Sequence, residues 1–213
     1  MQFSRFGPLV APTSLALILA SATSAQLVRA KLAFNDVSDP FERTLGERDR
    51  FGSALAGLGD LNGDGLKELA IGAEGDHREE GAVWIFSMRP SRQIAAFVKL
   101  GPSELLPFRL DSGDRFGSAI VALGDLDGNG VGDLAVGAGG DGGSSGFLTG
   151  PGATYLLFLD PNGTIRDFEK FNADSSAFQG LLDLGDAFGD ALASPGDLDG
   201  NGISDVVLDF PGY

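Results

Sequence analysis

The 213-residue chain has no cysteine and contains only one histidine, one tryptophan and two tyrosines. A chain without cysteine has no disulfides to stabilise it and no thiol nucleophile. The single histidine, His77, lies in the polar segment 76–80, where a solvated loop side chain is the simplest interpretation. No glycine-rich phosphate loop follows a strand and opens a helix, so nucleotide chemistry has no support. These absences argue against an enzyme.

Basic residues are also scarce. The chain has 15 lysines and arginines against 30 aspartates and glutamates, which gives a formal net charge of −15. Such a chain lacks the basic patch through which proteins bind nucleic acid or anionic lipid, so we expect no nucleic-acid partner. Much of the acidity has a local cause, because nine carboxylates fall in three short loops.

Apolar runs long enough to cross a membrane are absent. The best candidate, Leu9–Ala20, is interrupted by Pro12, and it is shorter than the ~20 residues that a membrane helix needs. Arg5 precedes this run and small residues follow it at positions 20–25, a pattern that predicts a secretory signal peptide over residues 1–25. An uncleaved anchor is the alternative. We therefore expect a secreted or cell-surface protein without membrane insertion.

One acidic loop occurs three times, at residues 60–68, 125–133 and 197–205. Each copy has oxygen-bearing side chains at loop positions 1, 3, 5 and 9, a glycine at position 6 and an apolar residue at position 7. Three of the four polar side chains are carboxylates in every copy, and they repel one another unless a cation lies among them. Oxygen ligands at alternate positions of a tight turn suit calcium above all.

Other acidic loops have a different pattern. An EF-hand loop carries a bidentate glutamate at position 12, whereas position 12 here is Ile71, Val136 or Leu208. The short apolar segments 69–73 and 134–138 are typical of buried strands rather than of an exit helix. A sharp turn without metal is one alternative. An aspartate nucleophile of the Asp-x-Asp-Gly type is another, although an active site is needed only once.

The similarity between the copies extends beyond the loops. A Phe-Gly pair precedes each loop, at Phe51, Phe116 and Phe188, with spacings of 65 and 72 residues. Each full period holds four short segments with the pattern of a β-strand. The last of the four covers residues 93–100 in one repeat and 164–171 in the next. Four strands in a period are typical of a β-propeller blade rather than of a helical solenoid. The sequence therefore predicts an all-β fold of four-stranded blades.

Two connections have recognisable composition. Asn162–Gly163 predicts a tight hairpin, because both residues tolerate positive φ. The Gly- and Ser-rich segment 139–152 predicts a long flexible loop between the second and third strands of its blade, and its counterpart 74–80 is shorter and charged. Such loops are where a propeller usually meets its ligands, although a solvent-facing loop without a partner is the simpler interpretation.

Over residues 46–213 the pattern resembles the FG-GAP repeat of integrin alpha-subunit propellers. It consists of Phe-Gly, then Gly-Asp-Leu-(Asp/Asn)-Gly-(Asp/Asn)-Gly, then Leu-Ala-(Ile/Val)-Gly-Ala. The resemblance implies that each repeat forms a blade, that usually seven blades close a ring, and that each acidic loop binds one calcium ion, up to three here. The implied ligands are Asp60, Asn62, Asp64, the carbonyl of Leu66 and Glu68; Asp125, Asp127, Asn129, the carbonyl of Val131 and Asp133; and Asp197, Asp199, Asn201, the carbonyl of Ile203 and Asp205.

The chain departs from the family pattern after each loop. The proline of the name-giving Gly-Ala-Pro is replaced by Glu74 in the first repeat and by Gly139 in the second. The third repeat has Asp209-Phe-Pro211 in place of Gly-Ala-Pro. This change weakens the prediction for the end of that strand but not for its loop.

The repeats predict the domain organisation. We expect a signal peptide, an N-terminal segment, two blades and a partial third blade, at 1–25, 26–45, 46–110, 111–182 and 183–213. Propellers need about four to eight blades to close. We therefore expect the chain to be part of a longer protein whose C-terminal blades are its partners; self-assembly of short chains is the alternative. Because residues 31–45 resemble 170–182, we expect the N-terminal segment to supply the outer strand of the closing blade.

These features favour a non-enzymatic, calcium-binding extracellular module for protein or glycan recognition, in the adhesion class that the resemblance implies. Structural calcium would take the place of the missing disulfides. The alternative is an accessory propeller of a secreted enzyme, of polysaccharide lyase or phospholipase type, whose catalytic domain lies outside this chain. A third interpretation is a truncated product without activity. No residue identifies the ligand.

Overall fold

The computed structural model describes residues 16–19, 30–33, 45–91, 93–102, 106–142 and 150–209. The chain divides into two units, residues 1–47 and 48–213. In the first unit, β1 (Ala16–Leu19) pairs antiparallel with β2 (Ala30–Ala33). The expected signal peptide and the blade-closing N-terminal segment lie mostly outside the described residues, so both remain predictions.

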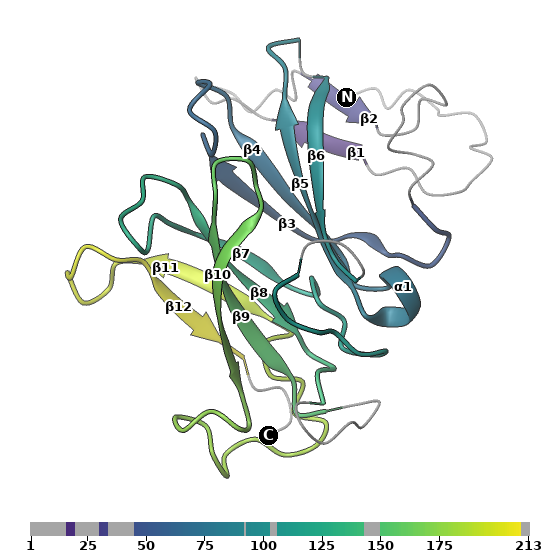
Figure 1. Cartoon of the computed structure of the whole chain (residues 1–213), viewed down its shortest axis with the longest axis vertical. Helices are drawn as coiled ribbons and strands as arrows, with labels where there is room; N and C mark the ends of the chain where they lie inside the picture. The colour runs from purple at the N-terminus through teal and green to yellow at the C-terminus, as the bar shows by residue number, and fades with distance from the viewer. Residues whose placement is uncertain are drawn as a thin grey trace, which may run out of the picture. The chain divides into compact units, whose positions relative to one another are not determined.

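The second unit begins with a four-stranded antiparallel sheet in the order β3-β4-β5-β6 (Figure 1). Its strands are β3 (Phe51–Gly59), β4 (Glu68–Ala73), β5 (Ala82–Met88) and β6 (Ile94–Leu100). The first five residues of β5 are buried, as expected of a central strand that is covered on both faces. The edge strand β6 is more exposed and carries the only charged residue of these two strands, Lys99.

A second antiparallel sheet repeats this arrangement. It runs β7-β8-β9-β10 in consecutive pairs, drawn in teal and green in Figure 1. Its strands are β7 (Ile120–Gly124), β8 (Asp133–Ala138), β9 (Ala153–Leu159) and β10 (Ile165–Asn172). A two-stranded sheet of β11 (Leu192–Gly196) and β12 (Asp205–Leu208) follows. The prediction of four strands per period is confirmed for both full repeats.

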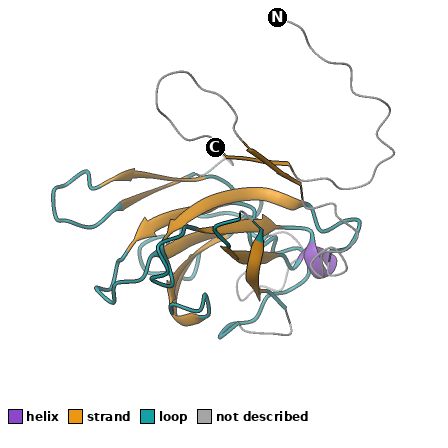
Figure 2. Cartoon of the chain, turned by 90° about the horizontal axis from the view of Figure 1, so that it is seen from above, coloured by secondary structure: helices purple, strands orange, loops and turns teal. Residues whose placement is uncertain are grey.

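Helix is almost absent from the described part of the chain. Its one helical element, α1 (Asp76–Glu79), is a single turn among strands and loops in Figure 2. His77, Arg78 and Glu79 have φ values of +50°, +67° and +65°, so this turn is left-handed. No described helix has the length and apolar character required to span a membrane. The all-β fold class is confirmed.

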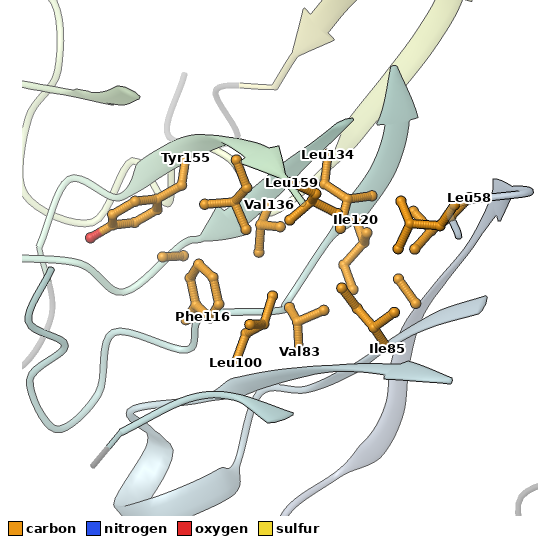
Figure 3. Packing of buried hydrophobic residues seen from close by; sticks show 14 of the residues in the cluster. Leu58, Val83, Ile85, Leu100, Phe116, Ile120, Leu134, Val136, Tyr155 and Leu159 are labelled. Carbon is orange, nitrogen blue, oxygen red and sulfur yellow. The ribbon is translucent and has the colours of Figure 1, made fainter. Parts of the chain in front are cut away.

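A hydrophobic core joins the two four-stranded sheets. Val83 and Ile85 of β5 face Leu134 of β8 and Leu159 of β9, and all four are at most 2% exposed (Figure 3). Side chains alternate between the faces of a strand, so the intervening Trp84 lies on the other face of β5. The predicted β-runs therefore contribute one face each to a shared core, as expected of stacked sheets.

Glycine residues allow the backbone of the second repeat to pack directly against the backbone of the first. A Cβ on Gly72 of β4 would lie 2.1 Å from the carbonyl oxygen of Gly117. Beside this contact, Gly81 and Phe116 form an isolated parallel bridge, and the same bridge recurs one repeat later. The Phe-Gly pair of one repeat thus docks on the strands of the preceding repeat, where only glycine leaves enough space.

The connections differ partly from expectation. A hairpin joins β9 to β10, as predicted, but among its residues only Gly163 has positive φ, at +82°. The turn is longer than two residues: the Asp160 N–H donates to the Thr164 carbonyl at 2.9 Å, and Pro161 fixes φ at its second position. In the loop expected at 139–152, residues 143–149 lie outside the described residues. The Gly150 N–H donates to the Gly140 carbonyl at 2.9 Å.

Candidate metal centre

Each acidic loop joins the first two antiparallel strands of its sheet, between β3 and β4, β7 and β8, and β11 and β12. The residue before loop position 1 pairs with the residue at position 9 in all three copies, as Gly124 pairs with Asp133. The predicted location between two strands is confirmed. Position 9 is therefore the first residue of a strand and lies directly across from the residue that precedes position 1.

The aspartate at position 1 organises each turn. In the second loop, Asp125 accepts hydrogen bonds from the Asn129 N–H through Oδ1 at 2.9 Å and from the Gly130 N–H through Oδ2 at 2.8 Å. Asp60 and Asp197 accept the same pair of bonds in their loops. Glycine is needed at position 6 because φ there is between +84° and +89°.

The side chains at positions 3 and 5 also turn inward, onto the backbone. Asp127 Oδ1 accepts from the Asn129 N–H at 3.1 Å, and Asn129 Oδ1 accepts from the Val131 N–H at 2.6 Å. The other two loops repeat both bonds. A carboxylate or amide oxygen retains a second lone pair when it accepts one such bond. The turn is thus held in shape while its oxygens keep capacity for a cation.

The carboxylate at position 9 bends back over its own loop. Glu68, Asp133 and Asp205 each accept a hydrogen bond from the backbone N–H at position 2, at 2.6, 2.8 and 2.7 Å respectively. Glu68 and Asp133 are 1% and 0% exposed, whereas Asp205 is partly exposed. Two of the three loops therefore contain a buried carboxylate, which is costly unless positive charge lies nearby.

The electrostatics reflect this cost. Burial raises the pKa of Glu68, and the charge of Asp64 raises it further. Burial likewise raises the pKa of Asp133. In the exposed third loop, by contrast, the hydrogen bond from the Gly202 N–H lowers the pKa of Asp197. A cation within the loops would favour the charged form of every one of these carboxylates.

The carboxylates converge in two of the loops. One oxygen from each carboxylate in a group lies within 4.8 Å of the others for Asp125, Asp127 and Asp133, and for Asp197, Asp199 and Asp205. The first loop, with Asn62 at position 3, is not gathered as tightly. The donors are all oxygens, the ligand type that calcium prefers. The residues present therefore fit a hard divalent cation, and the individual ligand assignments remain predictions.

The structure also shows contacts to the second loop that sequence reasoning missed. Leu159, at the end of β9, donates its N–H to Asp133 Oδ1 at 3.0 Å, and its carbonyl accepts from Asn129 Nδ2 at 3.2 Å. Arg166 of β10 forms an ion pair with Asp127. The one signal in the sequence was the hairpin near 162–163, which ends β9 and starts β10 beside this loop.

A second repeated feature that the sequence analysis missed lies away from the loops. Lys99 Nζ is 2.7 Å from Asp76 Oδ2, and Lys170 Nζ is 2.8 Å from Asp141 Oδ2. Both aspartate side chains are at most 4% exposed. Aligning the repeats would have found the pairs, because a Gly-Asp follows the second strand and a lysine lies near the end of the fourth strand in both. Their burial and pairing indicate a structural role.

Comparison with known proteins agrees with this geometry. Residues 51–86 match the FG-GAP repeat family. Integrin alpha-PS5 of Drosophila melanogaster is 31% identical over 206 residues, which are 92% of this chain and 19% of that protein. Integrin alpha-3 of Cricetulus griseus is 32% identical over 163 residues, 74% of this chain and 14% of that protein. Integrin alpha-X of Homo sapiens is 42% identical over 91 residues, 42% of this chain and 8% of that protein.

The sheets, the loops and these matches define a chain of FG-GAP repeats folded as open, incomplete β-propeller blades. Its resemblance to integrin alpha subunits, predicted from the sequence, is confirmed over much of the chain. The chain spans at most 19% of the length of these three relatives.

Proposed function

We propose that this chain is part of a non-enzymatic extracellular β-propeller for adhesion or recognition, whose blades calcium stabilises. FG-GAP repeats of the integrin alpha type support the extracellular recognition role. A protein or glycan ligand and further blades of a longer chain are the partners that we propose. Secretion through the N-terminal signal peptide belongs to the same proposal.

The proposal rests on the set of side-chain oxygens that is repeated in the three acidic loops. Three loops place carboxylate or amide oxygens at the same four positions, with the same backbone hydrogen bonds at position 1. In each loop a calcium ion would be held by the side chains at positions 1, 3, 5 and 9 and by the carbonyl at position 7, which belongs to Leu66, Val131 or Ile203. Calcium accepts six to eight oxygens in flexible geometry, whereas magnesium demands a near-ideal octahedron.

Calcium would act on stability rather than on chemistry. A bound ion neutralises carboxylates that otherwise repel one another across the start of each sheet. With a dissociation constant of ~0.1 mM and ~1 mM free calcium, binding would add about 1.4 kcal/mol per site, or roughly 4 kcal/mol for three sites. That is a large part of a typical stability of ~5–15 kcal/mol. The chain has no disulfides, so it would depend on this stabilisation, which requires about millimolar free calcium.

His77 and the buried aspartates outside the loops make contacts that do not indicate catalysis. The imidazole of His77 is 58% exposed, and its Nε2 lies 3.9 Å from Glu80 Oε1 within the same turn. A general base needs a reacting group within hydrogen-bond reach, and this histidine contacts a neighbouring surface carboxylate instead. The deeply buried aspartates Asp76 and Asp141 are committed to lysines. We therefore propose no catalytic residue.

Thermal melting of the full chain tests the calcium role. We expect the melting temperature in 1 mM calcium to fall by several degrees when chelator is added. The variant D125N/D127N should lose part of this response, because it removes two of the three charges of the second loop. Glu169→Gln, an exposed acid on β10 outside the loops, should keep the whole response.

If the melting temperature is the same in calcium and in chelator, the proposed metal role is refuted. The recognition role needs its own test. The chain is applied to panels of extracellular proteins and glycans with calcium and then with chelator. We expect calcium-dependent retention on a protein or glycan; retention that persists in chelator, or none at all, would contradict the proposal.

A further inference from the structure

An arginine from outside the second acidic loop forms an ion pair with it. Arg166 of β10 pairs with Asp127 at loop position 3, and their side chains are 45% and 21% exposed. Asp127 Oδ1 already accepts the Asn129 N–H, whereas the guanidinium contacts Oδ2. The ion pair therefore engages the carboxylate oxygen that does not hold the turn together.

A β-bulge brings Arg166 to this place. Ile165 pairs with Leu159 and Asp167 pairs with Phe158, so Arg166 is the extra residue in β10. A bulge bends its strand and redirects the side chain of the inserted residue. Leu159 also hydrogen-bonds to two side chains of the same loop. The strand end that supports the loop thus also delivers a positive charge to it.

The first repeat has the same bulge but a different pair of residues. Met88 pairs with Ile94 and Ser87 pairs with Ala96, which leaves Ala95 as the extra residue. Loop position 3 of that repeat is the neutral Asn62. In the two full repeats, aspartate at position 3 therefore occurs with arginine at the bulge, and asparagine occurs with alanine. Both loops carry three carboxylates, but the arginine reduces the local charge of the second loop from −3 to −2.

We propose that Arg166 is an internal counter-ion that lowers the affinity of the second loop for a divalent cation. The inference rests on the proposed metal-binding function. Without metal, the guanidinium relieves repulsion among the loop carboxylates. With metal bound, the same positive charge repels the ion. Coulomb repulsion across about 6 Å of water-like medium, with salt screening, predicts roughly three- to tenfold weaker binding than without Arg166.

The experiment isolates the second loop in the full chain. The substitutions D60N and D197N remove the position 1 carboxylates of the other two loops. Calcium alone is then titrated calorimetrically into this background and into its Arg166→Ala and Arg166→Lys derivatives. Alanine is the natural residue at the equivalent bulge, so R166A should fold. We expect R166A to bind calcium three- to tenfold more tightly and R166K to stay within about twofold of the background.

Melting temperatures provide a second readout that a purely structural role would not produce. R166A should melt below the background in chelator, because it loses the counter-ion, and this deficit should shrink or reverse in saturating calcium, because R166A binds the ion more tightly. Arg109→Ala is the matched control: Arg109 is 85% exposed and pairs with Asp111 at 2.7 Å, away from the loops. It should leave calcium affinity unchanged.

The outcomes separate the inference from the proposed function. If the background binds calcium and R166A binds no more tightly, or R166A lowers the melting temperature equally in chelator and in calcium, the role of Arg166 is refuted and the metal site stands. If neither the wild-type chain nor the background binds calcium, the proposed function fails and the inference fails with it.

Discussion

The ammonium of Lys170 lies 5.2 Å from the ring centroid of Tyr155. Both side chains also meet Asp141: Lys170 Nζ is 2.8 Å from Oδ2, and the Tyr155 hydroxyl donates to Oδ2 at 2.7 Å. Lys99 lies at the same distance, 5.2 Å, over Trp84 in the first sheet. In both repeats, a lysine of the outer strand thus ties that strand to an aromatic ring of its neighbour and to a buried aspartate.

Removing Lys170 should therefore be costly. Lys170→Met leaves Asp141, 2% exposed, without its cation. We expect a loss of about 3–5 kcal/mol in unfolding free energy, because a buried charge stripped of its partner is not compensated by water. Urea unfolding at pH 7 measures it. The double variant K170M/D141N should recover much of the loss, since the amide is neutral and still accepts the Tyr155 hydroxyl. A loss below 1 kcal/mol in the single variant would contradict the assigned role.

Asp114 should make stability depend on pH. It is 6% exposed, and burial raises its pKa to about 6 from the usual 3.8, with Asp141 adding to the rise and Lys170 opposing it. Because the folded pKa exceeds the unfolded one, the folded state holds the proton more tightly between about pH 4 and 6. Ionisation of Asp114 then costs stability as pH rises through this window, on the order of 3 kcal/mol.

The substitution Asp114→Asn tests this sign. Its amide oxygen can still accept the Asp111 N–H, which the carboxylate accepts at 2.7 Å. We expect the variant to gain stability relative to wild type as pH rises from 4 to 7, measured by urea unfolding in chelator. Comparing the two chains at each pH cancels the titration of the loop carboxylates. A difference that stays flat, or that shrinks with pH, would refute the assignment.

The junction between repeats should not tolerate a methyl group. In Gly72→Ala the new Cβ would lie 2.1 Å from the Gly117 carbonyl oxygen, which is backbone and cannot move aside. We expect a loss of about 3 kcal/mol or more in unfolding free energy. Gly57→Ala is the matched control in β3, because no atom lies within 4 Å of its added Cβ. Equal stability of the two variants would show that the sheets are not held this closely.

Turn α1 should become more stable with glycine. Arg78 has a φ of +67° between two other left-handed residues, a conformation that costs an L-residue roughly 1–2 kcal/mol. We expect Arg78→Gly to raise the unfolding free energy by about 0.5–1 kcal/mol. Arg89→Gly, at an exposed residue with ordinary φ, should lower it by a similar amount. If both variants lose stability, the left-handed turn carries no strain.

The sequence predicted the features that depend on local spacing. Alternating oxygens and the glycine at position 6 predicted a tight loop between two strands, and the hydrogen bonds of Asp125 explain why that spacing works. The recurrence of Phe-Gly predicted repeated four-stranded sheets. It did not reveal that Phe116 docks on Gly81 of the preceding repeat, because nothing in a single repeat shows which backbone it meets.

Contacts between distant segments were not predicted, although aligning the repeats would have pointed to the Lys170–Asp141 pair. Arg166 reaches Asp127 only because a bulge in β10 redirects it, and one inserted residue leaves no pattern in the sequence. The buried Asp141 also lies in a glycine-rich segment that was interpreted as flexible. Its burial became clear only when β10 placed Lys170 over it.

The number of calcium ions bound by the intact chain tests the central claim most directly. Equilibrium dialysis at saturating calcium should give three ions per chain, and the paired substitution D197N/D199N should reduce the count to two. Binding of no ions, or a count that the substitution leaves unchanged, would contradict the assignment of the three acidic loops as metal centres.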